Sequence, residues 1–166
     1  SPLSLAFVAA TAAAIAPSDT VLEPSAGTGL LAIFAELAGA SLVLNELAET
    51  RTGLLRHLFP DVAVTSFDAG QIDDHLDPGV TPTVVLMNPP FSALANVDRR
   101  RTDAALRHVS SALVRLAEGG RLVAITQASL APDRCGGGSG ASGAGGGGGT
   151  GGVVGERLLG DERARQ

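Results

Sequence analysis

Short apolar runs alternate along the chain with segments in which apolar residues recur at helical spacing. The runs, which predict β-strands, are 21–23, 41–45, 62–67, 84–87 and 121–126. Helical spacing is seen in Leu30, Leu31, Ile33, Phe34 and Leu37, stopping at Gly39, and in Leu106, Val109, Leu113 and Leu116, stopping at Gly119. Strands and helices in this order predict an α/β fold with a mostly parallel sheet flanked by helices.

The first apolar stretch, Leu3 to Ala16, predicts one more helix, packed on the sheet and ended by Pro17. It is shorter than a membrane span, and no positive charge precedes it. We therefore interpret it as neither a membrane helix nor a signal peptide, and expect no contact with a membrane.

The turn after the first strand is built from small residues and reads Glu23-Pro24-Ser25-Ala26-Gly27-Thr28-Gly29. Glycines let the backbone approach a ligand closely, and the start of the following helix adds unpaired N–H groups. A turn that only connects a strand to a helix can look the same in isolation. The residues that follow the next strands favour a cofactor loop.

Those residues are polar. Glu46 follows the second strand, about 20 residues beyond the glycines, which is the spacing at which a carboxylate meets ribose hydroxyls. A solvated carboxylate at a helix start is the alternative interpretation. Asp68 follows the third strand. Because open α/β sheets bind ligands beyond the carboxyl ends of their strands, one crevice is expected to gather Glu23, Gly27, Gly29, Glu46, Asp68 and Asn88.

The fourth strand ends in Asn88-Pro89-Pro90-Phe91. Proline cannot donate to a sheet ladder, so the strand stops abruptly and delivers a polar amide and an aromatic ring to one place. The Asn88 side-chain oxygen and the Pro89 carbonyl are acceptors, and the Phe91 ring can stack on a planar group. The set suits an exocyclic or amide NH2 group. A tight turn with a core phenylalanine is the alternative.

Together with the opening Ser1-Pro2-Leu3-Ser4-Leu5-Ala6, these motifs resemble class I S-adenosylmethionine-dependent methyltransferases, and among them the adenine-N6 DNA methyltransferases. Stretches 21–36 and 44–60 also look like the methylase-like domain that precedes the helicase in bacterial strawberry notch family proteins. The resemblance covers about residues 1 to 131. It implies a Rossmann-like sheet, S-adenosylmethionine as cofactor, DNA as partner and a possible linked helicase region.

The family's roles imply a cofactor site and an acceptor site. The resemblance implies that the cofactor is bound by Glu23, Pro24, Ser25, Ala26, Gly27, Gly29, Glu46, Asp68 and Asn88. Gly27 and Gly29 would approach the methionine moiety, Glu46 the ribose and Asp68 the adenine amine. The catalytic set is Asn88, Pro89, Pro90 and Phe91, which would hold and stack the target base.

The acceptor motif alone leaves the substrate open. The same motif occurs in methyltransferases of ribosomal RNA guanine N2 and of release-factor glutamine, so RNA-base or protein-glutamine methylation stays an alternative. A non-catalytic cofactor-binding or scaffold module is another.

Composition limits these expectations. The net charge is −5 and all twelve basic residues are arginines, so strong nucleic-acid binding would need regions outside this segment. Arg99-Arg100-Arg101 is a local exception, either a phosphate-contacting loop or a solvated helix entry. The single Cys135 fits a reducing, cytoplasmic location. His57, His75 and His108 lack metal-ligand spacing and are expected to be surface or helix residues, with no metal site.

Two parts are expected: a methyltransferase-like domain over 1–133 and a flexible glycine-rich tail or linker over 134–166. One or two helical turns are conceivable around Leu158 and Leu159. Five strands are predicted where the family's sheet usually has seven, so the sheet is expected to be truncated after the fifth strand, with an exposed edge there.

Overall fold

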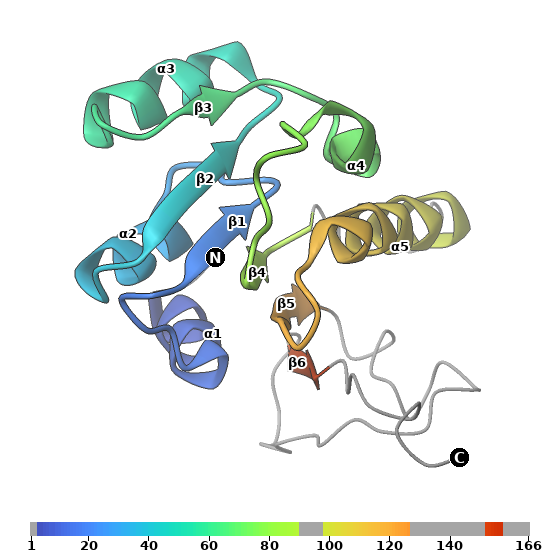
Figure 1. Ribbon diagram of the computed structural model, residues 1–166. Coiled ribbons are helices and arrows are strands. Elements are labelled where there is room, and N and C mark those ends of the chain that lie inside the picture. The colour runs from blue at the N-terminus through green and yellow to red at the C-terminus, as the bar shows by residue number, and fades with distance from the viewer. Residues whose placement is uncertain (1–2, 90–97, 127–151, 158–166) are drawn as a thin grey trace.

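The computed structural model describes residues 3–89, 98–126 and 152–157, with only the backbone described for 98–103 and 152–157. The chain forms a six-stranded sheet in the order β3-β2-β1-β4-β5-β6 (Figure 1). The strands are β1 Thr20–Glu23, β2 Ser41–Asn45, β3 Val64–Thr65, β4 Val84–Met87, β5 Arg121–Thr126 and β6 Gly152–Arg157. The first five are parallel, which confirms the predicted fold class.

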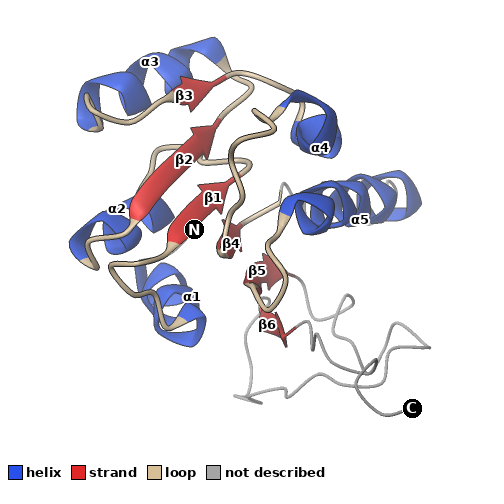
Figure 2. Ribbon diagram, in the orientation of Figure 1, coloured by secondary structure: helices blue, strands red, loops and turns tan. Residues whose placement is uncertain are grey.

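Helices cover both faces of the sheet (Figure 2). They are α1 Leu3–Ala13, α2 Leu30–Leu37, α3 Glu49–Leu58, the short 3-10 helix η1 Ala69–Gln71, α4 Ile72–His75 and α5 Asp98–Arg115. Helices α1, α2 and α3 pack on one face, and η1, α4 and α5 on the other.

Alternation along the strands builds the core on each face. In β1, Val21 packs with α1 and α2, whereas the next residue, Leu22, packs with α4 and α5. In β4, Val84 and Leu86 face α1 and α2, whereas Val85 and Met87 face α4 and α5. All four β4 residues are buried, as expected for a central parallel strand covered by helices on both faces.

The order of the strands switches sides at β1: the chain adds β2 and β3 on one side of β1 and then crosses to its other side to form β4. Strands β2 and β3 continue outward on one side of β1, and β4 and β5 lie on its other side. The loops that leave β1 and β4 therefore diverge, which opens a crevice at the carboxyl ends of these strands. Among the sequence-predicted polar residues, Asn88 follows β4, and Glu46 and Asp68 follow β2 and β3 at the same edge of the sheet.

Two elements differ from the sequence-based expectation. Strand β3 is limited to Val64–Thr65, not 62–67. Arg99, Arg100 and Arg101 are helical, in the first turns of α5, so the backbone agrees with a helix entry and not with a loop. The helix begins at Asp98, eight residues before Leu106, the first residue of its predicted apolar pattern.

A sixth strand was not predicted from the sequence. The parallel part of the sheet ends with β5, but β6 pairs antiparallel along the edge of β5, with Val153 opposite Ile125 and Val154 opposite Ala124. The β-branched pair suits a strand, and pairing satisfies backbone groups that an open edge would leave free. The expected open edge is therefore wrong. The expected helical turns near Leu158 and the domain boundary at residue 133 lie outside the described residues.

Candidate functional site

A cavity of about 290 Å³ lies at the carboxyl ends of β1, β2, β3 and β4. Six of the sequence-predicted site residues line it: Pro24, Ser25, Gly27, Glu46, Asp68 and Asn88. The volume is at the low end of the range for small-molecule sites. The structure therefore brings the ends of four strands to one cavity, as the order of polar residues along the chain predicted.

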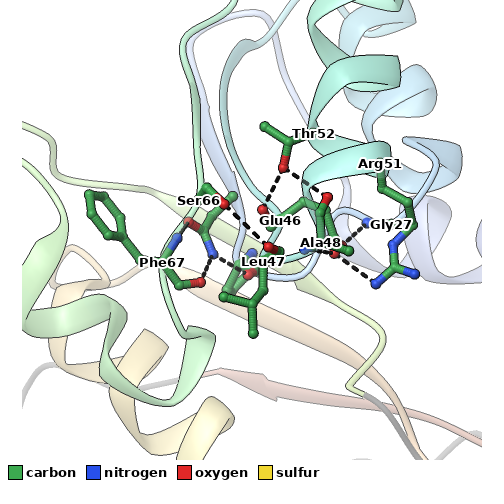
Figure 3. Close-up of polar contacts among 10 residues, drawn as sticks. Gly27, Glu46, Leu47, Ala48, Arg51, Thr52, Ser66 and Phe67 are labelled. Atoms are coloured by element: carbon green, nitrogen blue, oxygen red, sulfur yellow. Dashed lines mark hydrogen bonds and ion pairs between the residues drawn. The ribbon is translucent and has the colours of Figure 1, made fainter.

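Glu46 is the most tightly held residue of the cavity. It is 4% exposed, and its carboxylate accepts three hydrogen bonds. Oε2 accepts from the Gly27 backbone N–H at 2.9 Å, and Oε1 accepts from the Ala48 N–H and from Arg51, each at 2.8 Å (Figure 3). These contacts tie the glycine loop to the end of β2.

The same contacts decide the charge of Glu46. Burial alone would raise the pKa of Glu46, but the hydrogen bonds from Arg51, Ala48 and Gly27, with the charge of Arg51, outweigh it and lower the pKa. Glu46 is thus an anion at neutral pH. Three of its roughly four acceptor positions are occupied, so one remains for a ligand hydroxyl.

Asn45, the residue before Glu46, joins the ends of β1, β2 and β3. Its fully buried side chain donates to the carbonyls of Pro24 and Phe67, both at 2.9 Å. It accepts from the Phe67 N–H at 2.9 Å and from the Thr65 hydroxyl at 2.8 Å. All four hydrogen-bonding positions of the amide are used, which holds the loop after β1 against the segment that carries Asp68. Sequence reasoning missed this role.

The two loop glycines serve different purposes. Both have positive φ, +58° for Gly27 and +83° for Gly29. A Cβ added at Gly27 would meet nothing within 4 Å, whereas one at Gly29 would lie 2.7 Å from Phe59 Cε2. Gly27 lines the cavity, and Gly29 does not: it permits close packing of α2 against α3. Ala26 is also turned inward, in the core with Leu44 and Phe59.

Glu23 lies beneath the loop and does not line the cavity. It is 3% exposed, with one carboxyl oxygen hydrogen-bonded to the Ala32 N–H of α2. The other, Oε2, is buried without a hydrogen-bond partner among the described residues. Burial, reinforced by the nearby charge of Glu46, raises the pKa of Glu23 well above its ordinary value. Burial thus favours the neutral form of this carboxyl.

Asp68 and His108 form the opposite end of the cavity from the glycine loop. Asp68 is 59% exposed and caps η1 by accepting the Gly70 N–H at 2.9 Å. His108, on α5, lies with Nε2 3.8 Å from Asp68 Oδ1, and its side chain is 15% exposed. His108 lies on a helix, as predicted, and it also lines the cavity, which the sequence did not indicate.

Of the acceptor motif, Asn88 lines the cavity and is half-buried, and Pro89 is buried. Pro90 and Phe91 lie outside the described residues. Within the described ranges, no cluster of three or more histidine, cysteine, aspartate or glutamate side chains is arranged to hold a metal ion. The helices of the same ranges include none long and apolar enough to cross a membrane.

Comparison with solved structures identifies the fold. Solved structures of S-adenosylmethionine-dependent methyltransferases match the chain, and its fold is the class I fold of these enzymes. No protein-family model and no curated protein matches the sequence.

Three matches show the range of substrates on this fold. The Thermus thermophilus 16S rRNA N2 methyltransferase RsmC, in complex with AdoMet and guanosine, has a TM-score of 0.73 and 19% identity, over 96% of this chain and 43% of that one. The EcoKI restriction enzyme M protein has a TM-score of 0.61 and 16% identity, over 78% and 34%. The amino pentose methyltransferase CalS10 of Micromonospora echinaspora, bound to SAM, has 0.53 and 25%, over 79% and 50%. The chain thus spans half or less of each of these structures.

Proposed function

We propose that the chain binds S-adenosylmethionine and forms the catalytic part of an N-methyltransferase that acts on N6 of adenine in DNA. One observation carries the proposal: Asn88, from the acceptor motif, lines the same cavity as Glu46 and Asp68. Groups suited to an exocyclic amine and groups suited to a nucleoside cofactor therefore share one wall. DNA is the favoured substrate because the opening Ser1-Pro2 and the Glu23-Pro24 loop resemble those of adenine methyltransferases.

The residues of the cavity fit the cofactor. Glu46 is an anion with one acceptor position left, which suits a ribose hydroxyl. Gly27 leaves open space where a side chain would stand, so a ligand can approach the backbone. Asp68 is exposed and can accept from an adenine amine. Glu23 does not line the cavity, but its buried Oε2 has no hydrogen-bond partner among the described residues and is left for a hydrogen-bond donor.

The proposed chemistry needs no strong base. The cofactor, when bound, supplies a sulfonium methyl group for transfer to the amine nitrogen. Asn88 Oδ1 and the Pro89 carbonyl accept the two amine hydrogens, which turns the nitrogen lone pair toward that methyl group. The same acceptors stabilise the positive charge that develops on the amine during transfer. A duplex adenine must leave the base stack first, at a cost of a few kcal/mol.

A labelled-methyl transfer assay tests the proposal. Duplex DNA, ribosomal RNA and release factor are offered separately with labelled S-adenosylmethionine. We expect label in DNA, and at least a hundredfold less with Asn88→Ala, because positioning of the amine is lost. Gln71→Ala, which removes an exposed amide outside the cavity wall, is the matched control and should retain full activity. Transfer to protein alone would refute the DNA proposal.

Ribosomal RNA guanine N2 is the second candidate. It is favoured by the match to RsmC, which covers 96% of this chain and includes guanosine in its complex. Guanine also presents an exocyclic amine, so the same acceptors serve. Label in RNA and not in DNA would select this candidate. Cofactor binding without transfer to any acceptor would instead indicate a non-catalytic module.

The net charge of −5 affects both candidates. Affinity for nucleic acid grows with the number of phosphates that basic residues neutralise. We propose that regions beyond this segment, such as a linked helicase, supply most of the grip on the substrate. Weak, strongly salt-dependent activity of the isolated chain is the expected consequence.

A further inference from the structure

His108 forms part of the cavity wall without a role in the chemistry above. It lies on α5, far from the glycine loop in sequence, and closes the end of the cavity formed by Asp68. The ring lies beside Gly70, where an added Cβ would be 3.4 Å from His108 Cδ2 and 3.3 Å from Asp68 Oδ1. The imidazole therefore sits close against the turn that presents Asp68.

The contacts of the ring assign its tautomer. Nδ1 is buried and has no hydrogen-bond partner among the described residues, so a proton there would be an unsatisfied buried donor. Nε2 faces the carboxylate of Asp68, where a proton is favourable and a lone pair is not. Burial, together with the charge of Arg107, lowers the pKa of His108 despite the opposing effect of Asp68. The ring is therefore neutral at pH 7, with an N–H at Nε2.

His108 and Asp68 do not satisfy each other's hydrogen-bonding groups. At 3.8 Å, His108 Nε2 and Asp68 Oδ1 are too far apart for a hydrogen bond to each other. Asp68 Oδ1 is already occupied by the Gly70 N–H, whereas Oδ2 makes no hydrogen bond with any described residue. The end of the cavity thus presents a donor, His108 Nε2–H, beside an acceptor, Asp68 Oδ2.

We infer that His108 and Asp68 together bind the amino edge of the cofactor's adenine, so that His108 determines specificity for this base. The inference rests on the proposed function. Adenine presents an amine donor next to a ring-nitrogen acceptor, N1 on one side and N7 on the other. Asp68 accepts from the amine, and His108 Nε2–H donates to the neighbouring ring nitrogen. A 6-oxo purine reverses the donor at C6 and would set a carbonyl oxygen against the Asp68 carboxylate.

Binding of four probes to the whole chain tests the inference by titration calorimetry. They are S-adenosylhomocysteine, its 1-deaza and 7-deaza analogues, which each lack one ring acceptor, and its 6-oxo analogue. Wild type should bind one deaza analogue about tenfold more weakly than the parent, as expected for the loss of one hydrogen bond. His108→Leu should bind the parent about tenfold more weakly and no longer distinguish it from that analogue.

Matched variants separate recognition from packing. His108→Gln keeps an N–H donor and should restore part of the discrimination. His57→Leu removes an exposed histidine of α3 and should change neither affinity nor discrimination. If leucine at position 108 prevents folding, as judged by urea unfolding, His108→Phe provides an apolar ring in its place.

The outcomes are distinct. Equal weakening of all four probes by His108→Leu would overturn the inference and leave a packing role only. Undiminished discrimination in His108→Leu would overturn it as well. No binding of S-adenosylhomocysteine to wild type would overturn the proposed function itself, and with it the inference. Loss of discrimination with partial recovery in His108→Gln would support it.

Discussion

Replacing Asn45 with aspartate should destabilise the protein although the two side chains have the same shape. The amide donates to the carbonyls of Pro24 and Phe67 and accepts from Phe67 N–H and Thr65 Oγ1. Aspartate keeps the two accepted bonds. It loses both donated bonds and places a carboxylate oxygen against two carbonyl oxygens that now lie 2.9 Å from the amide nitrogen.

The magnitude follows from these two lost donors. A buried acceptor left without a partner costs about 1–3 kcal/mol, so two cost about 2–6 kcal/mol. We expect a loss of about 4 kcal/mol at pH 7, a large fraction of the roughly 5–15 kcal/mol by which domains of this kind are stable. Asn45 is fully buried, so the new carboxyl has a raised pKa in the folded state. The substitution therefore costs least at acidic pH, where the new carboxyl is protonated. The free energy of unfolding of the variant falls as pH rises through the raised pKa.

Urea unfolding of Asn45→Asp at pH 5 and pH 7 measures this loss. The control is Gln71→Glu, the same amide-to-acid change at an exposed position on η1, which should stay within about 0.5 kcal/mol of wild type. Affinity for S-adenosylhomocysteine should fall with Asn45→Asp, because the amide holds the Pro24 loop against the Phe67 segment. A loss below 1 kcal/mol at pH 7, or one independent of pH, would refute the reasoning.

Three further changes give distinct expected results. Gly29→Ala should lower the free energy of unfolding by about 3 kcal/mol in urea, because φ is +83° and the new methyl group would lie 2.7 Å from Phe59 Cε2. Gly27→Ala, with open space around it, should lower it by about 1 kcal/mol, and equal losses would contradict the packing role of Gly29. Glu46→Gln should remove a stabilising contribution that is present above the ordinary glutamate pKa of about 4.3 and lost as pH falls through the lowered pKa, so the difference from wild type in unfolding free energy should shrink toward acidic pH. Glu23→Gln should increase the unfolding free energy at pH 8 more than at pH 5, since a raised carboxyl pKa makes the folded state less stable as pH rises; no pH dependence of that gain would show that the carboxyl is not held neutral.

The sequence is informative about the sheet because strand ends are local signals. Each run of buried residues stops at a polar residue, and parallel strands place those residues at one edge, so the meeting of Glu46, Asp68 and Asn88 follows from topology alone. The purpose of Gly29 does not follow, since the motif resembles a ligand contact while the glycine in fact faces Phe59, thirty positions away.

Contacts between segments that are distant in the sequence explain why the roles of His108 and Asn45 and strand β6 were not predicted. His108 and Asp68 are separated by forty residues, and only the packing of α5 on η1 brings them together. Strand β6 is likewise specified by the edge of β5, to which it pairs, and not by a pattern strong enough to stand out in a glycine-rich region. Asn45 ends a strand like many other residues, and its four hydrogen bonds reach three residues at the ends of two other strands, β1 and β3.

The two ends of the cavity differ in how firmly they are held before a ligand arrives. At the glycine loop, Glu46 is buried and its carboxylate accepts three hydrogen bonds, so little ordering remains to be done on binding. At the other end, Asp68 is mostly exposed and the His108 Nε2–H has no acceptor within hydrogen-bonding distance among the described residues. A nucleoside would thus meet a sugar site that is already ordered, whereas the contacts to its base would form only on binding. Discrimination between bases should therefore be more sensitive to substitutions at Asp68 and His108 than to substitutions at Glu46, which should weaken all nucleoside ligands alike.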